Sequence, residues 1–284
     1  MPRTIALAAA IAAAATAAPA QEVNVYSYRQ PELIKPLIDA FTEKTGIEVN
    51  SVFIKEGLLE RLRAEGDRSP ADLVLTVDIS RLTALEDAGL TQAVESEVLH
   101  ENVPEAMRDD DGHWFGLTGR ARLIYASKER VEPGEVTTYE DLASDKWEGR
   151  ICTRSGAHSY TLGLIGAMIV HHGEDYTREW LQGVKDNLAR KPQGGDRPQI
   201  RAVAAGECDI ALGNTYYVGL MQTNEKDPEE RQAVATMKVK FPTFENGGTH
   251  VNISGAALAK YAPNRDNGVR LIEYLSSDAA QQIY

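Results

Sequence analysis

The sequence predicts an α/β protein of two lobes with a crevice between them, and three observations lead to this prediction. Apolar runs typical of strands alternate with apolar residues at helical spacing, which is the pattern of a parallel α/β sheet. An irregular stretch at 100–119 interrupts this alternation, which then resumes and divides the chain into two α/β units. The 284 residues are enough for roughly two domains, each with its own buried core.

The composition excludes several other classes of protein. Hydrophobic residues make up 43% and charged residues 25% of the chain, which is ordinary for a globular protein and rules out a disordered or collagen-like chain. The net charge of −12 argues against a nucleic-acid partner, because phosphate binding needs a basic face. Two cysteines exclude a disulfide-dense scaffold and a CxxC metal or redox site.

The first twenty residues have the pattern of a secretory signal peptide. Arg3 supplies a positive charge, residues 5–18 form a short apolar stretch, and Ala18-Pro19-Ala20 places small residues at a cleavage site. A buried N-terminal helix is the alternative. We therefore expect residues 1–20 to be removed and the mature chain to be exported to an oxidising compartment.

The first α/β unit contains three strands and two helices. Strands are expected at 23–29, 47–54 and 71–77, with one helix running from about Leu33 to Gly46 and another at 58–64. Because proline breaks a helix interior, we expect Pro31 in the lead-in loop and Pro36 in the first turn. The run at 71–77 is almost continuously apolar, which favours a strand covered on both faces.

The second unit and the closing segment continue the alternation. Strands are expected at 123–126, 150–153, 208–212, 237–241 and 251–258, and helices near 160–172, 176–189, 197–205, 216–222 and 265–276. The helical run at 278–284 has no cap, which predicts that further residues follow Tyr284. Cys152 and Cys208 each open an apparent strand, so they either form one disulfide or remain two buried thiols.

Candidate ligand-binding residues lie where strands give way to helices, because α/β sheets bind ligands beyond the carboxyl ends of their strands. Tyr216 and Tyr217 follow the strand at 208–212, and Asn214 is a good helix N-cap there. The alternative is that both tyrosines are half-buried aromatics. The sequence places this pair at the predicted crevice.

Two further junctions offer groups for an anion. Ser155, Gly156 and Ala157 precede a helix whose N-terminus favours negative charge, and we expect the phenol of Tyr160 to face the same crevice as Tyr216 and Tyr217. A plain helix cap is the alternative for this loop. Arg29 and Gln30 follow the first strand and offer a planar cation and an amide, although they are equally consistent with an ordinary surface pair.

Other motifs favour no catalytic or metal site. The patterns GxxxxGK[ST], GxSxG and HExxH are absent, and no nucleophile pairs with a base, so an exported hydrolase or transferase is disfavoured. His171-His172-Gly173 is typical of a helix end, where imidazoles meet the negative pole of the dipole. Asp109-Asp110-Asp111 is typical of a solvated turn, because no Glu follows at EF-hand spacing.

The sequence resembles the periplasmic ferric-ion-binding proteins, the substrate-binding subunits of bacterial iron(III) ABC transporters, over essentially the whole mature chain. Six segments carry the resemblance: Val25-Tyr26-Ser27-Tyr28-Arg29-Gln30-Pro31, 69–78, 116–122, 188–197, Gly213-Asn214-Thr215-Tyr216-Tyr217 and Asn252-Ile253-Ser254-Gly255. It implies a type II, transferrin-lobe-like fold, with residues 21–119 plus 242–284 in the first lobe and 120–241 in the second. It also implies a monomeric, non-enzymatic carrier that delivers Fe(III) to an inner-membrane permease.

The resemblance assigns the metal to Tyr160, Tyr216 and Tyr217, with carbonate or bicarbonate as a synergistic anion. By the same comparison, the anion is held by Ser155, Gly156, Ala157 and Asn214, with Arg29 and Gln30 reaching across and Arg120 near the crevice. In another branch of the family the first lobe supplies a His and a Glu, but Gln30 and Val77 occupy those positions here. A carrier for an organic or oxyanion solute is the alternative function.

Overall fold

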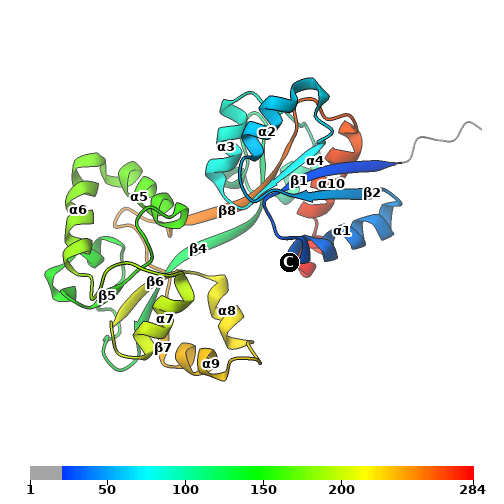
Figure 1. The fold of residues 1–284 in the computed structure, drawn as a ribbon. Coiled ribbons are helices and arrows are strands. Elements are labelled where there is room, and N and C mark those ends of the chain that lie inside the picture. The colour runs from blue at the N-terminus through cyan, green and yellow to red at the C-terminus, as the bar shows by residue number, and fades with distance from the viewer. Residues whose placement is uncertain (1–20) are drawn as a thin grey trace, which may run out of the picture.

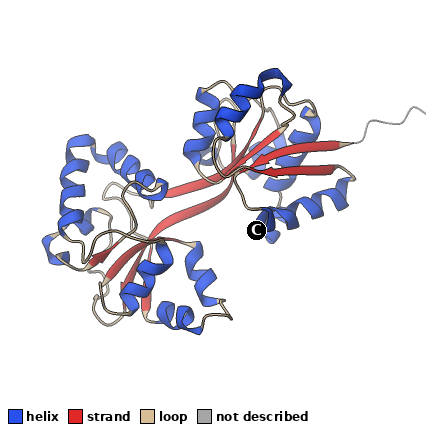
Figure 2. Cartoon of the chain, in the orientation of Figure 1, coloured by secondary structure: helices blue, strands red, loops and turns tan. Residues whose placement is uncertain are grey.

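The computed structural model describes residues 21–284, so the predicted signal peptide lies outside the described residues. Two lobes are joined by two long strands, β4 (Phe115–Ser127) and β8 (Val251–Leu258), as Figure 1 shows. Helices lie against the strands of both lobes (Figure 2). The predicted two-lobed α/β fold is confirmed. No helix within residues 21–284 is long and apolar enough to cross a membrane.

A single sheet runs through both lobes because β4 takes part in each. Its strand order is β2-β1-β3-β8-β4-β6-β5, and β7 also pairs with β4. The beginning of β4 is antiparallel to β8, whereas its end lies between β6 and β7. Where β4 begins to pair with β8, a Cβ on Gly255 would lie 2.3 Å from the carbonyl oxygen of Phe115, so this close approach requires glycine.

The first lobe contains the parallel strands of the N-terminal unit and the two C-terminal helices. The pairs β1–β2 and β1–β3 are parallel, so β1 and β3 end on the same side. The further strands of this lobe are β1 (Glu22–Ser27), β2 (Glu48–Phe53) and β3 (Leu73–Thr76). The helices are α1 (Pro31–Thr45), α2 (Leu58–Glu65), α3 (Ile79–Asp87), α4 (Glu97–Asn102), α10 (Arg265–Ser276) and α11 (Asp278–Ile283), with short 3-10 turns at Gly66–Arg68 and Glu105–Met107.

The second lobe continues the chain from the end of β4. Its further strands are β5 (Ile151–Cys152), β6 (Ile210–Asn214) and β7 (Met237–Lys240). Its helices are α5 (Ser159–His172), α6 (Glu174–Asp186), α7 (Asp196–Ala204), α8 (Tyr216–Gln222) and α9 (Pro228–Ala235), with 3-10 turns at Glu140–Ala143 and Asp145–Trp147.

Three sequence-based expectations are wrong in detail. Helix α1 begins at Pro31, so Pro36 lies inside the helix. Both prolines are exposed, so the backbone around the missing N–H faces solvent and the helix tolerates the ring. The stretch at 100–119 is not wholly irregular, since β4 already begins at Phe115. Asn214 ends β6 and is not a helix cap, because Thr215 occupies the N-cap position of α8.

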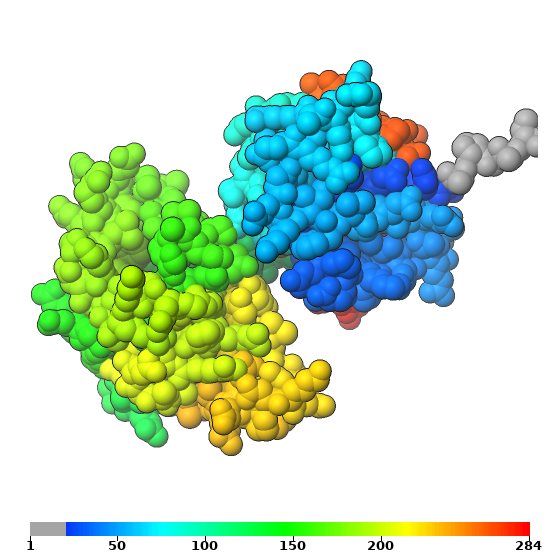
Figure 3. Space-filling view, in the orientation of Figure 1, coloured from blue at the N-terminus to red at the C-terminus, as the bar shows by residue number. Residues whose placement is uncertain are grey.

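Each lobe has its own hydrophobic core. The core of the first lobe gathers Phe41 and Leu73 with C-terminal residues such as Leu271, whereas Trp147 and Phe244 belong to the second. The space-filling view shows the hollow between the two bodies (Figure 3). Because Phe244 packs in the second lobe and the β8 residue Ile253 packs in the first, we propose that the chain crosses back between residues 244 and 253, and not at 242.

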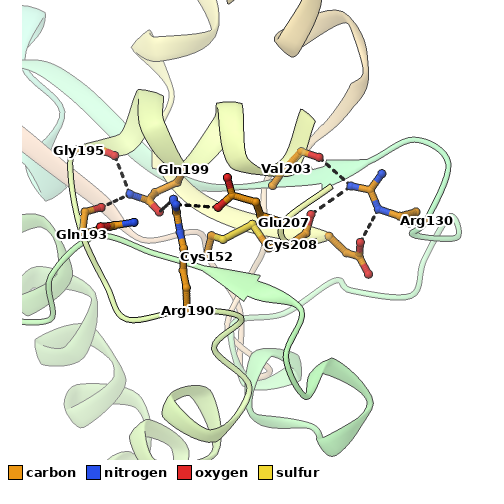
Figure 4. Close-up of a disulfide and its surroundings, with 10 residues drawn as sticks. Arg130, Cys152, Arg190, Gln193, Gly195, Gln199, Val203, Glu207 and Cys208 are labelled. Atoms are coloured by element: carbon orange, nitrogen blue, oxygen red, sulfur yellow. Dashed lines mark hydrogen bonds and ion pairs between the residues drawn. A yellow bond between two sulfur atoms is a disulfide. The ribbon is translucent and has the colours of Figure 1, made fainter. Parts of the chain in front are cut away.

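A disulfide joins β5 to the segment just before β6. Cys152 and Cys208 are both buried, with Cα atoms 5.9 Å apart and a separation of 56 positions in sequence (Figure 4). The bond decides between the two alternatives that the sequence left open for these cysteines. It also fixes the strand that leads directly into the loop at 153–158, next to the candidate site.

Candidate metal centre

A cleft of about 1330 Å³ lies between the lobes. On the first-lobe wall, Tyr28, Arg29 and Gln30 follow the carboxyl end of β1, and Val77 follows that of β3. The second-lobe wall is formed by side chains at the starts of α5, α7 and α8, namely Tyr160, Arg197, Tyr216 and Tyr217, together with Leu220 further along α8. Strand ends and helix starts therefore meet in the cleft, as α/β topology predicts.

Three phenols from two helices gather on the second-lobe wall. Tyr160 is the second residue of α5, and Tyr216 and Tyr217 are the first two residues of α8. The hydroxyl of Tyr216 donates a hydrogen bond to that of Tyr160 at 3.2 Å, and the rings of Tyr216 and Tyr217 have centroids 4.4 Å apart. The tyrosines singled out from the sequence thus lie together at the cleft.

Local hydrogen bonds set the start of α5. His158 is the N-cap residue, and its Nδ1 accepts the backbone N–H of Tyr160 at 3.2 Å. Burial, together with the charge of Arg154, lowers the pKa of His158 below its usual value. A neutral imidazole keeps the lone pair that this cap needs, so the helix start that carries Tyr160 is fixed at neutral pH.

The environment of Tyr216 favours the neutral form of its phenol in the free protein. Burial raises the pKa of Tyr216, and the neighbouring hydroxyls of Tyr160 and Tyr217 raise it further. Tyr216 nevertheless remains 38% exposed and lines the cleft. A ligand that binds this phenol as an anion must displace a proton from it.

Two guanidinium groups flank the ring of Tyr160. The Cζ atom of Arg154 lies 4.9 Å from the ring centroid, and that of Arg120 lies 5.3 Å from it. Arg120 is also tied to the first lobe, because it donates to the carbonyl of Val77 at 2.6 Å and to the carboxylate of Asp78 at 3.2 Å. Two guanidinium groups, each also paired with an aspartate, therefore lie beside the ring of Tyr160.

The residues expected to hold an anion are only partly brought together. Arg29, Gln30 and Arg120 line the cleft, and buried Asn214 donates its side-chain amide to the hydroxyl of Tyr216 at 3.4 Å. In contrast, Ser155, Gly156 and Ala157 are exposed and are not part of the cleft wall. The amide of Ala157 donates instead to the hydroxyl of Ser155 at 3.3 Å.

The histidine pair predicted to end a helix does so, outside the cleft. His171 and His172 are the last residues of α5, and the Nε2 atom of His172 lies 2.5 Å from the carboxylate of Glu140. Within residues 21–284, no group of three His, Cys, Asp or Glu side chains is arranged to hold a metal ion. Tyrosine oxygens are therefore the candidate metal ligands of the described chain.

Sequence reasoning missed two charged residues beneath the tyrosines. Asp196 is buried and forms an ion pair with the partly buried Arg154, with a distance of 3.2 Å between Nη1 and Oδ1. Asp196 lies in the segment Gly194-Gly195-Asp196-Arg197, which the sequence singled out only as part of a family resemblance. Its position at the start of a helix was a signal, but its arginine partners lie 42 and 74 residues away in sequence.

Comparison with known proteins places this architecture in a family. A family model described as bacterial extracellular solute-binding protein matches residues 27–282. The chain belongs to this family. It is 47% identical to iron uptake protein A1 of Synechocystis over 262 residues, which cover 92% of this chain and 72% of that protein.

Solved structures of family members agree. A Bordetella ferric binding protein superposes with a TM-score of 0.87 at 50% identity, covering 93% of this chain and 83% of that one. A Trichodesmium protein solved in complex with iron and citrate ligands gives a TM-score of 0.86 at 42% identity, covering 92% and 83%. The predicted resemblance to ferric-ion-binding proteins is thereby confirmed. The relatives of the chain are binding proteins of transport systems, and not enzymes.

Proposed function

We propose that this protein is a periplasmic ferric-ion-binding protein of an iron-uptake system. It captures Fe(III) with the phenolates of Tyr160, Tyr216 and Tyr217 and delivers the ion to an ABC permease of the inner membrane. The observation that carries the proposal is the 3.2 Å approach of the Tyr160 and Tyr216 hydroxyls in an interlobe cleft that Tyr217 also lines. The iron-related names of the relatives support the same cargo.

The chemistry of the donors fits this cargo. Fe(III) is a small, hard trication, and phenolate is a hard anionic oxygen donor, so three phenolates neutralise the charge of the ion. A thiolate, which would attract softer metals, is not available in the described chain, since both cysteines are in the disulfide. The raised pKa of Tyr216 favours its neutral form before binding, so the ion displaces a proton from this phenol when it binds.

A synergistic anion completes the site in this proposal. Carbonate or bicarbonate would meet Arg29 and Gln30 from the first lobe and Asn214 and Arg120 near the phenols, all of which lie at the cleft or the small hollow beside it. Guanidinium groups suit such planar oxyanions because they offer paired donors. The citrate in the Trichodesmium structure shows that a carboxylate accompanies iron in that relative.

The proposal also covers the cellular location of the protein and its oligomeric state. Residues 1–20 would direct the chain to the periplasm, and removing Arg3 with them leaves the mature protein more acidic. We propose a monomer, because the cleft is complete within a single chain and draws on both of its lobes. The ABC permease then meets one two-lobed molecule.

A second candidate function is transport of an organic anion without a metal. The cleft volume of about 1330 Å³ and the arginines Arg29, Arg120 and Arg197 on its walls favour this alternative. In that case the tyrosines would hydrogen-bond or stack on the ligand, and no metal–phenolate absorption would arise.

The visible spectrum on addition of ferric citrate tests the proposal. We expect a phenolate-to-iron charge-transfer band that saturates at one iron per protein, with metal analysis giving the same stoichiometry. Sodium citrate without iron is the matched control and should give no band. A silent spectrum together with tight binding of citrate alone would overturn the ferric function in favour of the organic anion.

A further inference from the structure

The buried carboxylate of Asp196 is a hub of hydrogen bonds, and it is not among the proposed ligands. Asp196 is 1% exposed and opens α7. Its Oδ1 accepts a hydrogen bond from Arg154 at 3.2 Å. Its Oδ2 accepts one from Arg122 at 2.6 Å and one from the backbone N–H of Asn214 at 3.0 Å. Both oxygens are therefore engaged, as a buried charge requires.

Each side of this hub leads to a different phenol. On one side, the guanidinium of Arg154 lies 4.9 Å from the ring centroid of Tyr160. On the other, Asn214 donates its side-chain amide to the hydroxyl of Tyr216 at 3.4 Å. One carboxylate thus connects the loop before α5 with the junction of β6 and α8. These are the two segments whose tyrosine hydroxyls meet at 3.2 Å.

The loop that precedes Asp196 is also fixed by hydrogen bonds. The side-chain amide of Gln199 donates to the carbonyls of Gln193 and Gly195, and the guanidinium of Arg190 donates to Gln199 at 3.1 Å (Figure 4). From the strand side, a Cβ on Gly213 would lie 3.4 Å from the Cβ of Asp196, so β6 packs closely against it. Asp196 therefore has little freedom to move.

We propose that Asp196 is a positioning residue of the ferric site. It fixes the ring of Tyr160 through Arg154 and the hydroxyl of Tyr216 through Asn214, so that two ligand oxygens converge before the ion arrives. This inference rests on the proposed ferric function. Groups behind the ligands of a metal commonly govern affinity in this way, and their loss typically costs 10–100-fold in metal binding.

The charge of the hub suits this role. Two arginines share the one carboxylate, so the group carries a net positive charge beneath the phenols. Three phenolates and an anion on Fe(III) would carry a net negative charge, which this buried positive charge offsets. Asp196 therefore holds Arg154 in the place where its charge and its planar face both act on Tyr160.

The test uses two variants and one matched control in the full-length mature protein. Asp196→Asn weakens the hub, and Arg154→Met removes the cation beside Tyr160 while keeping an apolar side chain against the ring. Asp209→Asn is the control, because Asp209 also holds two arginines, Arg130 and Arg150, at 2.5 Å each, but does not line the cleft. Thermal unfolding, ferric affinity and the absorption per bound iron are measured for each.

We expect Asp196→Asn and Arg154→Met to bind Fe(III) roughly 10–100-fold more weakly, with a shifted or weaker band per bound iron. Asp209→Asn should unfold at a lower temperature but keep the affinity and band of the wild type. A folded Arg154→Met protein with wild-type affinity and band would overturn the inference, and this variant decides the matter if Asp196→Asn does not fold. A wild-type protein without any ferric band would instead overturn the proposed function.

Discussion

Removing the hydroxyl of Tyr216 separates metal binding from folding. In Tyr216→Phe the ring and its packing against Tyr217 are kept, and only the oxygen is lost. We expect the variant to fold normally and to bind Fe(III) far more weakly, because one of three anionic oxygens is missing. The prediction requires that the hydroxyl contributes little to the stability of the fold.

The structural cost of this change is small. The hydroxyl contacts Tyr160 at 3.2 Å and Asn214 at 3.4 Å, both long for hydrogen bonds, and the side chain is 38% exposed. Losing each of these two bonds costs about 0.5–1.5 kcal/mol. In a protein of this size that lowers the melting temperature by only about 2–4 °C per kcal/mol. Because groups behind a metal's ligands already contribute roughly 10–100-fold, losing a ligand itself should cost more than about 100-fold.

The assay is a ferric titration followed by visible absorption, with citrate as the competing chelator and calorimetry for stability. Tyr261→Phe is the matched control, since Tyr261 is 46% exposed and lies outside the cleft. It should behave as the wild type in both measurements. A Tyr216→Phe protein with unchanged affinity and an unchanged band would refute the assignment of this phenol as a ligand.

Three further outcomes are expected. Because the pKa of Tyr216 is raised, binding of Fe(III) must displace its proton. Ferric affinity should therefore fall as pH falls, by up to about tenfold per pH unit for each phenol that ionises on binding. A pH-independent affinity in competition titrations would contradict this prediction. Replacing Cys208 by Ser opens a loop of 56 residues to Cys152 and should lower the free energy of unfolding by roughly 2–4 kcal/mol, measured by urea denaturation with the reduced wild type for comparison. Arg29→Ala should weaken the anion more than the metal, so titrations with bicarbonate should lose their advantage over those without it.

Elements with a strong local pattern were predictable from the sequence. The strand at 251–258 and the helix at 265–276 have the bounds that the sequence predicts, because one is apolar and the other has apolar residues at helical spacing. The start of β4 was missed for a physical reason. Residues 116–120 run between the two cores, so Gly116, Thr118, Gly119 and Arg120 show no apolar pattern, and pairing with β8 alone makes this segment a strand.

The site was predictable in part. Position after a strand was enough to single out Tyr216 and Tyr217, because topology brings strand ends to one edge. The hub at Asp196 could not be found in the same way. Its arginines come from β4 and from the loop after β5, and nothing local to either segment indicates that they share one buried carboxylate.

The paired segments of β4 and β8 between the lobes also determine how the two bodies can move. A ribbon of two hydrogen-bonded strands resists stretching and sliding, but it bends and twists with little loss of bonding. Any widening or narrowing of the crevice is therefore a rotation about this ribbon. Arg120 and Asn252 lie on the ribbon, and both donate hydrogen bonds to Asp78. Such a rotation therefore keeps this polar contact in place and leaves each lobe intact.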